Sequence, residues 1–526
     1  MRSIEPSTPA CDSLPPKGGL LLLGLLLFLL LLRLGALPLV GPDEPRYVRV
    51  AVEMHRAGDL VLPTLGGKPW LEKPPLYYWL AGVFFSFLGE TELASRLPSV
   101  LSTLLVALST AILGARFYGR TAGLHAGFVL ATSLLAFAYG HAAAMDALLA
   151  ACATASIGLF ALGIFEIAGG LAIPAAWAFA GLAALAKGPL GILLPLLVLG
   201  LYGLLARDRR VLKAFSLPGL VLILAIAGPW YVLILRREGS EFVQTFLLGH
   251  NVQRFLTTEH HHPGSVLYYV GVLLLGLFPW TPLLLPGLAR VRLRTSRVDL
   301  FVFLWFLAPF LFFTAAQSKL PGYILPCLPP LALLAGREAA RIATDGRGIA
   351  PRIGALLGVA LGALLACAPL FVRRLGDPGW PTLVPFGVWA LLVALVYSRR
   401  LGPDPVGAVS VLRVGGAGLL LLLALLAPEI LERNESGRML FAPSRGRRVL
   451  ALGAWRTAWI AGYFYDDGKV EEVQGPGDVL KAVAAGPTLV VVGAEERRLL
   501  ERLPSLSCVA LSQGPRGTAL LRVTAR

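Results

Sequence analysis

The sequence predicts an α-helical polytopic membrane protein that ends in a small α/β domain. Two observations on composition predict the membrane part: 56% of the 526 residues are hydrophobic and only 15% are charged, whereas soluble domains carry roughly 25% charged residues. A third observation is that long apolar stretches recur as far as residue 427, after which the composition becomes that of a soluble domain.

Thirteen apolar stretches approach the length of about 20 residues that a helix needs to cross a bilayer. They lie at 18–40, 97–116, 121–139, 143–167, 172–187, 189–206, 215–235, 265–287, 299–316, 321–336, 352–371, 382–398 and 405–427. We therefore expect a transmembrane domain over residues 1–427 with about 13 transmembrane helices. The first stretch follows Arg2 and Lys17, as in a signal peptide, but it lacks a clear small-x-small cleavage site, so we interpret it as a transmembrane helix.

The distribution of arginine predicts the orientation of these helices. If the N-terminus is cytoplasmic and the apolar stretch 75–89 does not cross, five Arg-rich loops fall inside, as the positive-inside rule requires. These loops are 116–120, 207–210, 290–297, 337–352 and 399–400. A full crossing by 75–89 would reverse the loops after it, so we predict a re-entrant or interfacial segment there. The loops 41–96 and 236–264 then lie outside the cytoplasm.

The chain after the last apolar stretch reads as a polar linker, 428–446, and a small extracytoplasmic α/β domain, 447–526. Hydrophobic patterns predict strands near 448–453, 488–493 and 518–523 and helices at 477–485 and 494–502. About 80 residues can enclose a modest core. Because this domain shows no pattern of nucleophiles or metal ligands, we expect it to dock or pack rather than to carry chemistry.

The charge and the cysteines exclude other classes of protein. A formal net charge of +16 would suit nucleic-acid binding, but the arginines lie in short loops without a basic stripe or base-stacking motif. The five cysteines show no CxxC or metal-ligand spacing, so no disulfide framework is expected. The histidines at 260–262 could ligate a metal, although such a run is more often a solvated loop.

The first outer loop is the most polar segment of the membrane part. Its ionisable residues are Asp43, Glu44, Arg46, Arg49, Glu53, Arg56, Asp59, Lys68, Glu72 and Lys73. Such a cluster is expensive to hold beside lipid, so it indicates a functional site. Asp43 has two interpretations that the sequence leaves open. It either caps a surface helix that begins near Pro45 or acts as a general base or ligand facing an acceptor.

Four more charged residues stand out: Asp146, Lys187 and Lys319 near the ends of apolar stretches, and Arg254 in the loop 236–264. The carboxylate of Asp146 lies close to two apolar stretches and needs a partner, which favours a functional role. Lys319 stands at the end of a span, which favours the same interpretation. Lys187 and Arg254 could instead be interfacial anchors whose aliphatic stems lie along the lipid.

The pattern DEPRY…GD…P…EKPPLYYW between residues 43 and 79 resembles a known superfamily. It is that of the dolichyl-phosphate-mannose protein mannosyltransferases and aminoarabinose (lipid A) transferases, membrane glycosyltransferases with the GT-C fold. Further motifs follow in the superfamily's order: an RLP turn at 96–98, HAAAMD at 141–146, an AKGP turn at 186–189, HNVQRF at 250–255, FPW at 278–280 and SKLPGYILP at 318–326. The resemblance covers residues 20–335, and the C-terminal domain resembles that of the aminoarabinose transferases in placement only.

The resemblance implies an inverting transfer of a sugar from a polyprenyl phosphate, undecaprenyl or dolichyl, outside the cytoplasm. Carried onto this chain, it makes Asp43 and Asp146 catalytic, and Lys73, Arg254 and Lys319 the cations that bind the donor phosphate. Supporting roles fall to Glu44, Glu72, Tyr77, Lys187, His250 and Tyr323. No organic cofactor is implied. Some members use a divalent metal ion and others do not, so a metal at Glu72 stays open.

We therefore expect a hexosyl- or pentosyltransferase of the bacterial inner membrane whose active site and C-terminal domain face the periplasm. Its acceptor is expected to be lipid A or a related envelope lipid or glycan. A protein O-mannosyltransferase is the nearest variant, and a flippase for a lipid-linked sugar is the alternative of another class. Transporters hold their charges near mid-membrane in broken helices. Here the charges gather at outer helix ends, which favours the enzyme.

Overall fold

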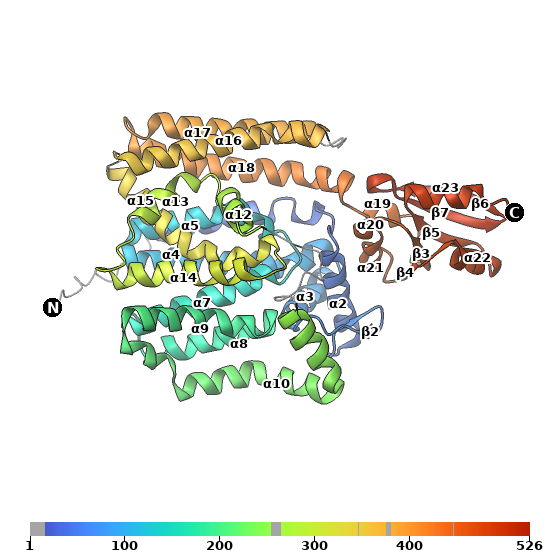
Figure 1. Cartoon of the computed structure of the whole chain (residues 1–526), viewed down its shortest axis with the longest axis horizontal. Helices are drawn as coiled ribbons and strands as arrows, with labels where there is room; N and C mark the ends of the chain where they lie inside the picture. Colours follow the sequence, from blue (N-terminus) through green and yellow to red (C-terminus); the bar gives the residue numbers. More distant parts are fainter. Residues whose placement is uncertain (1–15, 254–264, 346, 375–379, 445) are drawn as a thin grey trace.

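The computed structural model describes residues 16–253, 265–345, 347–374, 380–444 and 446–526. Figure 1 shows two parts side by side along the long axis of the molecule: a large helical bundle and a smaller part with strands, which holds the C-terminus. Helices α2 (Asp43–Ala57) and α3 (Leu76–Leu88) lie at the end of the bundle that faces the smaller part. The polar segment singled out in the sequence therefore lies where the two parts meet.

The bundle consists of long apolar helices, most of which run along the long axis in Figure 1. They are α1 (Pro16–Leu31), α4 (Glu92–Tyr118), α5 (Arg120–Ala131), α6 (Leu134–Gly140), α7 (Asp146–Ile164), α8 (Ala172–Lys187), α9 (Leu190–Ala206), α10 (Leu217–Phe242), α12 (Tyr268–Gly276), α13 (Leu284–Ala289), α14 (Arg297–Ala315), α15 (Leu328–Thr344), α16 (Ile349–Arg374), α17 (Trp380–Arg400) and α18 (Pro405–Asn434). Large apolar side chains stay exposed on the outer helices α10, α16 and α17, as expected of surfaces that face lipid.

Within the described ranges, eight helices are long and apolar enough to cross a membrane, or ten if each of two bent pairs counts as one span. The bent pairs, α5 with α6 and α12 with the 281–289 segment, occupy two of the thirteen predicted stretches. Helices α8 and α9 are shorter, and the stretch 321–336 divides into a 3-10 helix, Pro321–Cys327, and α15. A membrane-embedded helical bundle is confirmed, and ten of the thirteen predicted stretches meet this test of length and composition when each bent pair counts as one span.

Three predicted boundaries differ from the structure. Helix α10 is broken at Gly239, whose φ of 56° and ψ of −131° are not helical, and after this break helical structure resumes and continues through the π-helix Val243–Gln253, inside the expected 236–264 loop. Helix α18 continues into the expected linker as far as Asn434. The motif at 96–98, expected as a turn, lies inside α4, which begins at Glu92 after the N-cap Thr91. In these places residues outside the apolar stretches adopt helical structure.

Helix α2 is amphipathic and lies at the end of the bundle that faces the C-terminal domain (Figure 1). Its residues Val48, Ala51 and Met54 are buried at helical spacing, and they share a core with α3. After α2, a short hairpin pairs β1 (Thr64–Leu65) with β2 (Lys68–Pro69). Gly66 and Gly67 form its turn with φ of 62° and 75°, backbone angles that glycine adopts without steric cost. This hairpin leads directly to Glu72 and Lys73.

The C-terminal domain is a five-stranded mixed sheet with strand order β4-β3-β5-β7-β6. The strands are β3 (Val449–Leu452), β4 (Val470–Val473), β5 (Thr488–Val492), β6 (Leu506–Gln513) and β7 (Ala519–Ala525). Helices α22 (Pro476–Ala484) and α23 (Ala494–Arg502) pack on one face, and α19 (Arg438–Phe441), α20 (Arg456–Ile460) and α21 (Gly462–Tyr465) on the other. The three predicted strands and two helices are confirmed. Strands β4 and β6 were missed because these edge strands expose many of their residues.

Candidate active site

Asp43 is the first residue of α2 and does not cap it. Its carboxylate instead accepts a hydrogen bond from Arg46 Nη2 at 2.6 Å, and Arg46 Nε donates to the carbonyl of Pro42 at 2.6 Å. The guanidinium of Arg46 also lies 5.4 Å from the centre of the Trp70 ring. The side chain of Asp43 remains 44% exposed. A carboxylate that is held by one arginine yet open to solvent can meet a substrate.

Glu44, one residue further, is buried and has a different environment. Its carboxylate pairs with Arg96 Nη2 at 3.1 Å and accepts from the backbone amides of Val40 at 2.8 Å and Ala143 at 2.7 Å. Arg96 in turn donates to the carbonyl of Leu37 at 2.7 Å. A buried charge pair with these additional hydrogen bonds is a structural junction. It fixes the start of α2 against α4 and the turn before α7.

Asp146, Lys187 and Tyr323 form a second group at the end of α7. Lys187 Nζ donates to Asp146 Oδ1 at 2.5 Å and lies 4.6 Å from the centre of the Tyr323 ring. Gly322 brings its backbone so close that an added Cβ would stand 2.7 Å from Asp146 Oδ1. Three segments far apart in the chain therefore meet at one carboxylate. The predicted turn at 186–189, with φ of 81° at Gly188, delivers the lysine to it.

Tyr47 on α2 connects the two groups. Burial, and after it the negative charge of Asp43, raises the pKa of Tyr47 well above its ordinary value. Asp146 contributes to the same shift, so both carboxylates lie within electrostatic reach of one phenol. The two residues expected to be catalytic therefore act electrostatically on a common buried side chain, although they lie 103 positions apart in the sequence.

Lys73, Lys319 and Tyr77, which the sequence also assigned to the site, each have different surroundings. Lys73 follows the hairpin and donates to the carbonyl of Glu72 at 3.2 Å. Lys319 is buried, and its Nζ donates to the carbonyl of Ala316 at 2.5 Å. No carboxylate of the described chain pairs with Lys319 within 4 Å, so its charge can serve an anion. Tyr77 is buried and donates to the carbonyl of Ser95 at 2.9 Å, which is a structural contact.

Part of the predicted site falls outside the residues that the structure describes. Arg254 and the histidines at 260–262 lie outside the described residues. His250 belongs to the π-helical segment, but its side chain also lies outside the described part. Among the residues that the structure describes, no three His, Cys, Asp or Glu side chains gather in a way that could hold a metal ion. Glu72 therefore belongs to no such cluster among the described residues.

Sequence reasoning gave no individual role to Arg46, Tyr47 or Arg96, although Arg46 belongs to the ionisable cluster of the first outer loop. The pairing of Arg46 with Asp43 could have been predicted, because a spacing of three residues places both side chains on one face of a helix. Arg96 was noted only as part of a motif. Its partner Glu44 lies 52 positions away, and no local sequence pattern predicts that pairing.

Comparison with known proteins places these residues in a family. A model of the dolichyl-phosphate-mannose-protein mannosyltransferase family matches residues 72–232. An undecaprenyl phosphate-α-4-amino-4-deoxy-L-arabinose arabinosyl transferase of Aeromonas salmonicida is 31% identical over 389 residues, which cover 70% of this chain and 70% of the relative. This chain belongs to the superfamily of GT-C glycosyltransferases that includes the protein mannosyltransferases and the aminoarabinose transferases. The resemblance seen in the sequence motifs is confirmed.

Other members of the superfamily define how far the likeness extends. A transferase of the same name from Yersinia enterocolitica is 32% identical over 348 residues, 64% of this chain, and the match spans 61% of the length of that relative. The crystal structure of ArnT from Cupriavidus metallidurans bound to undecaprenyl phosphate superimposes with a TM-score of 0.78 and 25% identity. That superposition covers 96% of this chain and 97% of ArnT. The GT-C architecture therefore extends through the C-terminal domain.

Proposed function

We propose that this protein transfers a sugar from an undecaprenyl phosphate donor to an acceptor in the bacterial envelope, with lipid A as the first acceptor to test. The relatives' names support 4-amino-4-deoxy-L-arabinose as the sugar, and the structural relative was solved with undecaprenyl phosphate. The observation that carries the proposal is that the solvent-open carboxylate of Asp43, held by Arg46, and the Asp146–Lys187 pair both lie within electrostatic reach of the buried Tyr47. A scaffold or pore would have no need for this arrangement.

The arrangement suits a single displacement. The acceptor oxygen attacks the anomeric carbon of the sugar, and the bond between that carbon and the phosphate oxygen breaks. The bonding electrons leave with undecaprenyl phosphate, whose growing negative charge needs nearby cations. Lys73 and Lys319 supply two cations of the described chain, and Arg254 remains a predicted third.

The carboxylates have separate tasks in this proposal. A hydroxyl acceptor gives its proton to Asp43, which is the exposed carboxylate of the pair, whereas an acceptor that is already ionised needs no base. Asp146 is neutralised by Lys187 and is better suited to hold the sugar or the acceptor in place. Because the relatives' sugar carries an amino group, Asp146 is a natural partner for that cation.

We propose that the reaction takes place at the periplasmic face of the inner membrane. The Arg-rich loops predict the cytoplasmic side, and the positive-inside rule then directs α2 and the C-terminal domain outward when all thirteen apolar stretches cross and 75–89 does not. The lipid tail of the donor would lie among the apolar helices of the bundle. A polyprenyl donor that has been translocated to the outer leaflet can reach both groups of residues from the membrane.

The test is a transfer assay with purified protein in detergent, undecaprenyl phosphate carrying radiolabelled 4-amino-4-deoxy-L-arabinose, and lipid A. Wild type should move label into lipid A. If the acceptor is a hydroxyl, Asp43→Asn should lower kcat by about 100-fold or more, the usual size of a general-base contribution. Asp345→Asn, which changes an exposed carboxylate just after α15, is the matched control and should retain full activity.

Three other outcomes would contradict parts of the proposal. Full activity of Asp43→Asn would leave that residue without a catalytic role. Label recovered in protein rather than lipid would favour a protein O-mannosyltransferase-like acceptor, which the matched family model also describes. Labelled donor that crosses proteoliposome membranes without any transfer would replace the enzyme by a flippase.

A further inference from the structure

The C-terminal domain contacts α2 through one exposed loop. Asp467 Oδ1 accepts hydrogen bonds from Arg49 Nη1 at 2.5 Å and Arg56 Nη1 at 2.8 Å, so one carboxylate joins two arginines that lie about two turns apart on α2. Asp467 has a φ of 54° and Gly468 a φ of 76°. An added Cβ at Gly468 would stand 3.0 Å from Arg49 Cζ. This left-handed turn therefore lets the loop backbone approach the arginine closely.

Arg49 transmits this contact toward Lys73. Its Nε donates to Glu53 Oε1 at 2.7 Å, and both side chains are nearly buried. Glu53 in turn accepts from the amides of Gly66 at 2.8 Å and Gly67 at 3.1 Å, which form the turn of the β1–β2 hairpin. Partial burial alone would raise the pKa of Glu53. Hydrogen bonds to its carboxylate, of which the one from Arg49 has the largest effect, lower that pKa below its ordinary value. The hairpin that delivers Lys73 is thus held by a chain of contacts beginning at Asp467.

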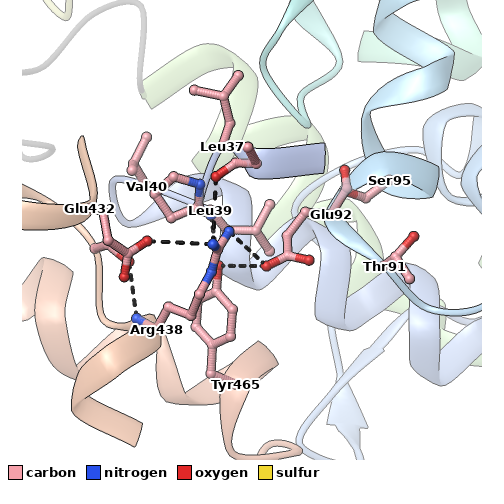
Figure 2. A network of polar contacts seen from close by, with 12 residues as sticks. Leu37, Leu39, Val40, Thr91, Glu92, Ser95, Glu432, Arg438 and Tyr465 are labelled. Carbon is pink, nitrogen blue, oxygen red and sulfur yellow. Dashed lines mark hydrogen bonds and ion pairs between the residues drawn. The ribbon is translucent and has the colours of Figure 1, made fainter. Parts of the chain in front are cut away.

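A second contact reaches the other end of the site, and Figure 2 shows it. The backbone amide of Leu39 donates to the Tyr465 hydroxyl at 2.8 Å, and that hydroxyl donates to Glu92 Oε1 at 3.3 Å. Arg438 Nη2 pairs with the same Glu92 oxygen at 3.0 Å, and its Nη1 lies 3.5 Å from Glu432 Oε2. Helix α21, the segment after α18 and the start of α4 therefore meet at one network.

Leu39 lies in the short segment whose backbone forms hydrogen bonds with the Glu44–Arg96 pair. Arg96 Nη2 donates to the carbonyl of Pro38 at 2.7 Å, while the amide of Val40 donates to Glu44. Tyr465 thus supplies the partner for the one amide between these two contacts. The segment enters α2 four residues later at Asp43. Its position determines where the carboxylate of Asp43 points.

From these contacts we infer that the C-terminal domain is a working part of the active site, and that Asp467 and Tyr465 are positioning residues for the transfer. Tyr465 fixes the entry to α2 and hence Asp43, and Asp467 fixes the hairpin and hence Lys73. The inference rests on the proposed function. It replaces the expectation that this domain only docks or packs.

The test uses two mild substitutions in the full-length protein. Asp467→Asn removes the charge but keeps a residue type that tolerates a positive φ, and Tyr465→Phe removes only a hydroxyl. The matched control is Glu471→Gln, which breaks an exposed ion pair with Arg448 inside the same domain. The assay measures kcat and the KM for the undecaprenyl phosphate sugar separately, and thermal unfolding reports folding.

Both variants should lower kcat about tenfold or more, because small misplacements of reacting groups cost up to about 100-fold in rate. The KM for the donor and the unfolding temperature should stay near those of wild type, and Glu471→Gln should behave as wild type. As a second readout, the amides of residues 37–44 should exchange hydrogen faster in Tyr465→Phe.

The outcomes separate the two proposals. If wild type transfers sugar and both variants keep its kcat, the positioning role is overturned while the proposed function stands. If kcat falls only in proportion to the folded fraction, the contacts are merely structural and the inference is likewise overturned. If wild type transfers no sugar at all, the proposed function fails, and the inference that depends on it fails with it.

Discussion

Glu44 and Asp43 are adjacent in sequence, but their carboxylates differ in exposure to solvent and in hydrogen-bond partners. Asp43 is half open to solvent and bound by one nearby arginine, whereas Glu44 is enclosed by Arg96 and two backbone amides. Burial of a charge is tolerated only when its partners are complete. We therefore propose that the chemistry belongs to the exposed carboxylate and that the buried one holds it in place.

Breaking the buried pair should destabilise the protein strongly. Replacement of Arg96 by methionine leaves Glu44 charged in a buried place, and losing one partner of such a pair costs about 3–5 kcal/mol. We expect a lower unfolding temperature in detergent for Arg96→Met. The double variant Arg96→Met/Glu44→Gln should recover part of that loss because no uncompensated charge remains. An unfolding temperature of Arg96→Met equal to that of wild type would show that the pair is not a junction.

The stability of the C-terminal domain should depend on pH through Asp466. Burial comes first among the causes that raise the pKa of Asp466 from 3.8 to about 6. Between these two values the folded state binds more protons than the unfolded chain, so the free energy of unfolding should fall as pH rises from about 4 to about 6. Unfolding followed at several pH values should show this slope in wild type and a weaker slope in Asp466→Asn. Equal slopes would contradict the assignment.

At the scale of elements, glycines allow the helices of the bundle to approach each other closely. An added Cβ at Gly123 on α5 would stand 2.4 Å from the backbone nitrogen of Ala115 on α4. An added Cβ at Gly336 on α15 would stand 2.4 Å from the nitrogen of Ala126 on α5. Packing of helices in membranes depends on such small residues because it cannot rely on the hydrophobic effect. These contacts fix α4, whose first turns carry Arg96.

Gly123→Ala should therefore destabilise the bundle, because overpacking of this kind costs about 1–3 kcal/mol. Gly200 on α9 is the matched control, since an added Cβ there meets no heavy atom within 4 Å. Gly200→Ala should be neutral or slightly stabilising, because alanine favours a helix over glycine. Thermal unfolding of the two variants in the same detergent gives the comparison. Equal stability of both would mean that α4 and α5 are free to separate.

The 3-10 turn Pro321–Cys327 should control the position of Asp146. An added Cβ at Gly322 would lie 2.6 Å from Tyr139 Cε1 as well as close to the Asp146 carboxylate, so one of these side chains must move. Gly322→Ala should lower kcat about tenfold or more while the protein still folds, because the displaced groups are side chains rather than backbone. Kinetic constants and the unfolding temperature measured together test this. Unchanged kcat would show that Asp146 has room to adjust.

At the scale of the whole molecule, the sequence predicts what depends on composition and local pattern. The membrane bundle, the polar first outer loop and three strands of the C-terminal domain follow from apolar stretches, charge clusters and alternation. The ends of α10 and α18 do not, because helical structure continues into polar residues beyond the apolar stretches, in α10 after a break at Gly239. The contact between Arg49 and Asp467 spans 418 positions and leaves no local trace. Such contacts depend on how the two parts of the molecule meet (Figure 1).

The measurement that tests the central claim most directly follows both products of one reaction. Purified protein is mixed with undecaprenyl phosphate-4-amino-4-deoxy-L-arabinose and lipid A, and the released undecaprenyl phosphate and the modified lipid A are quantified, with the sugar's anomeric configuration read by NMR. A single displacement predicts equal amounts of the two products and an inverted anomeric centre. A retained configuration, or undecaprenyl phosphate released without glycosylated acceptor, would contradict the account.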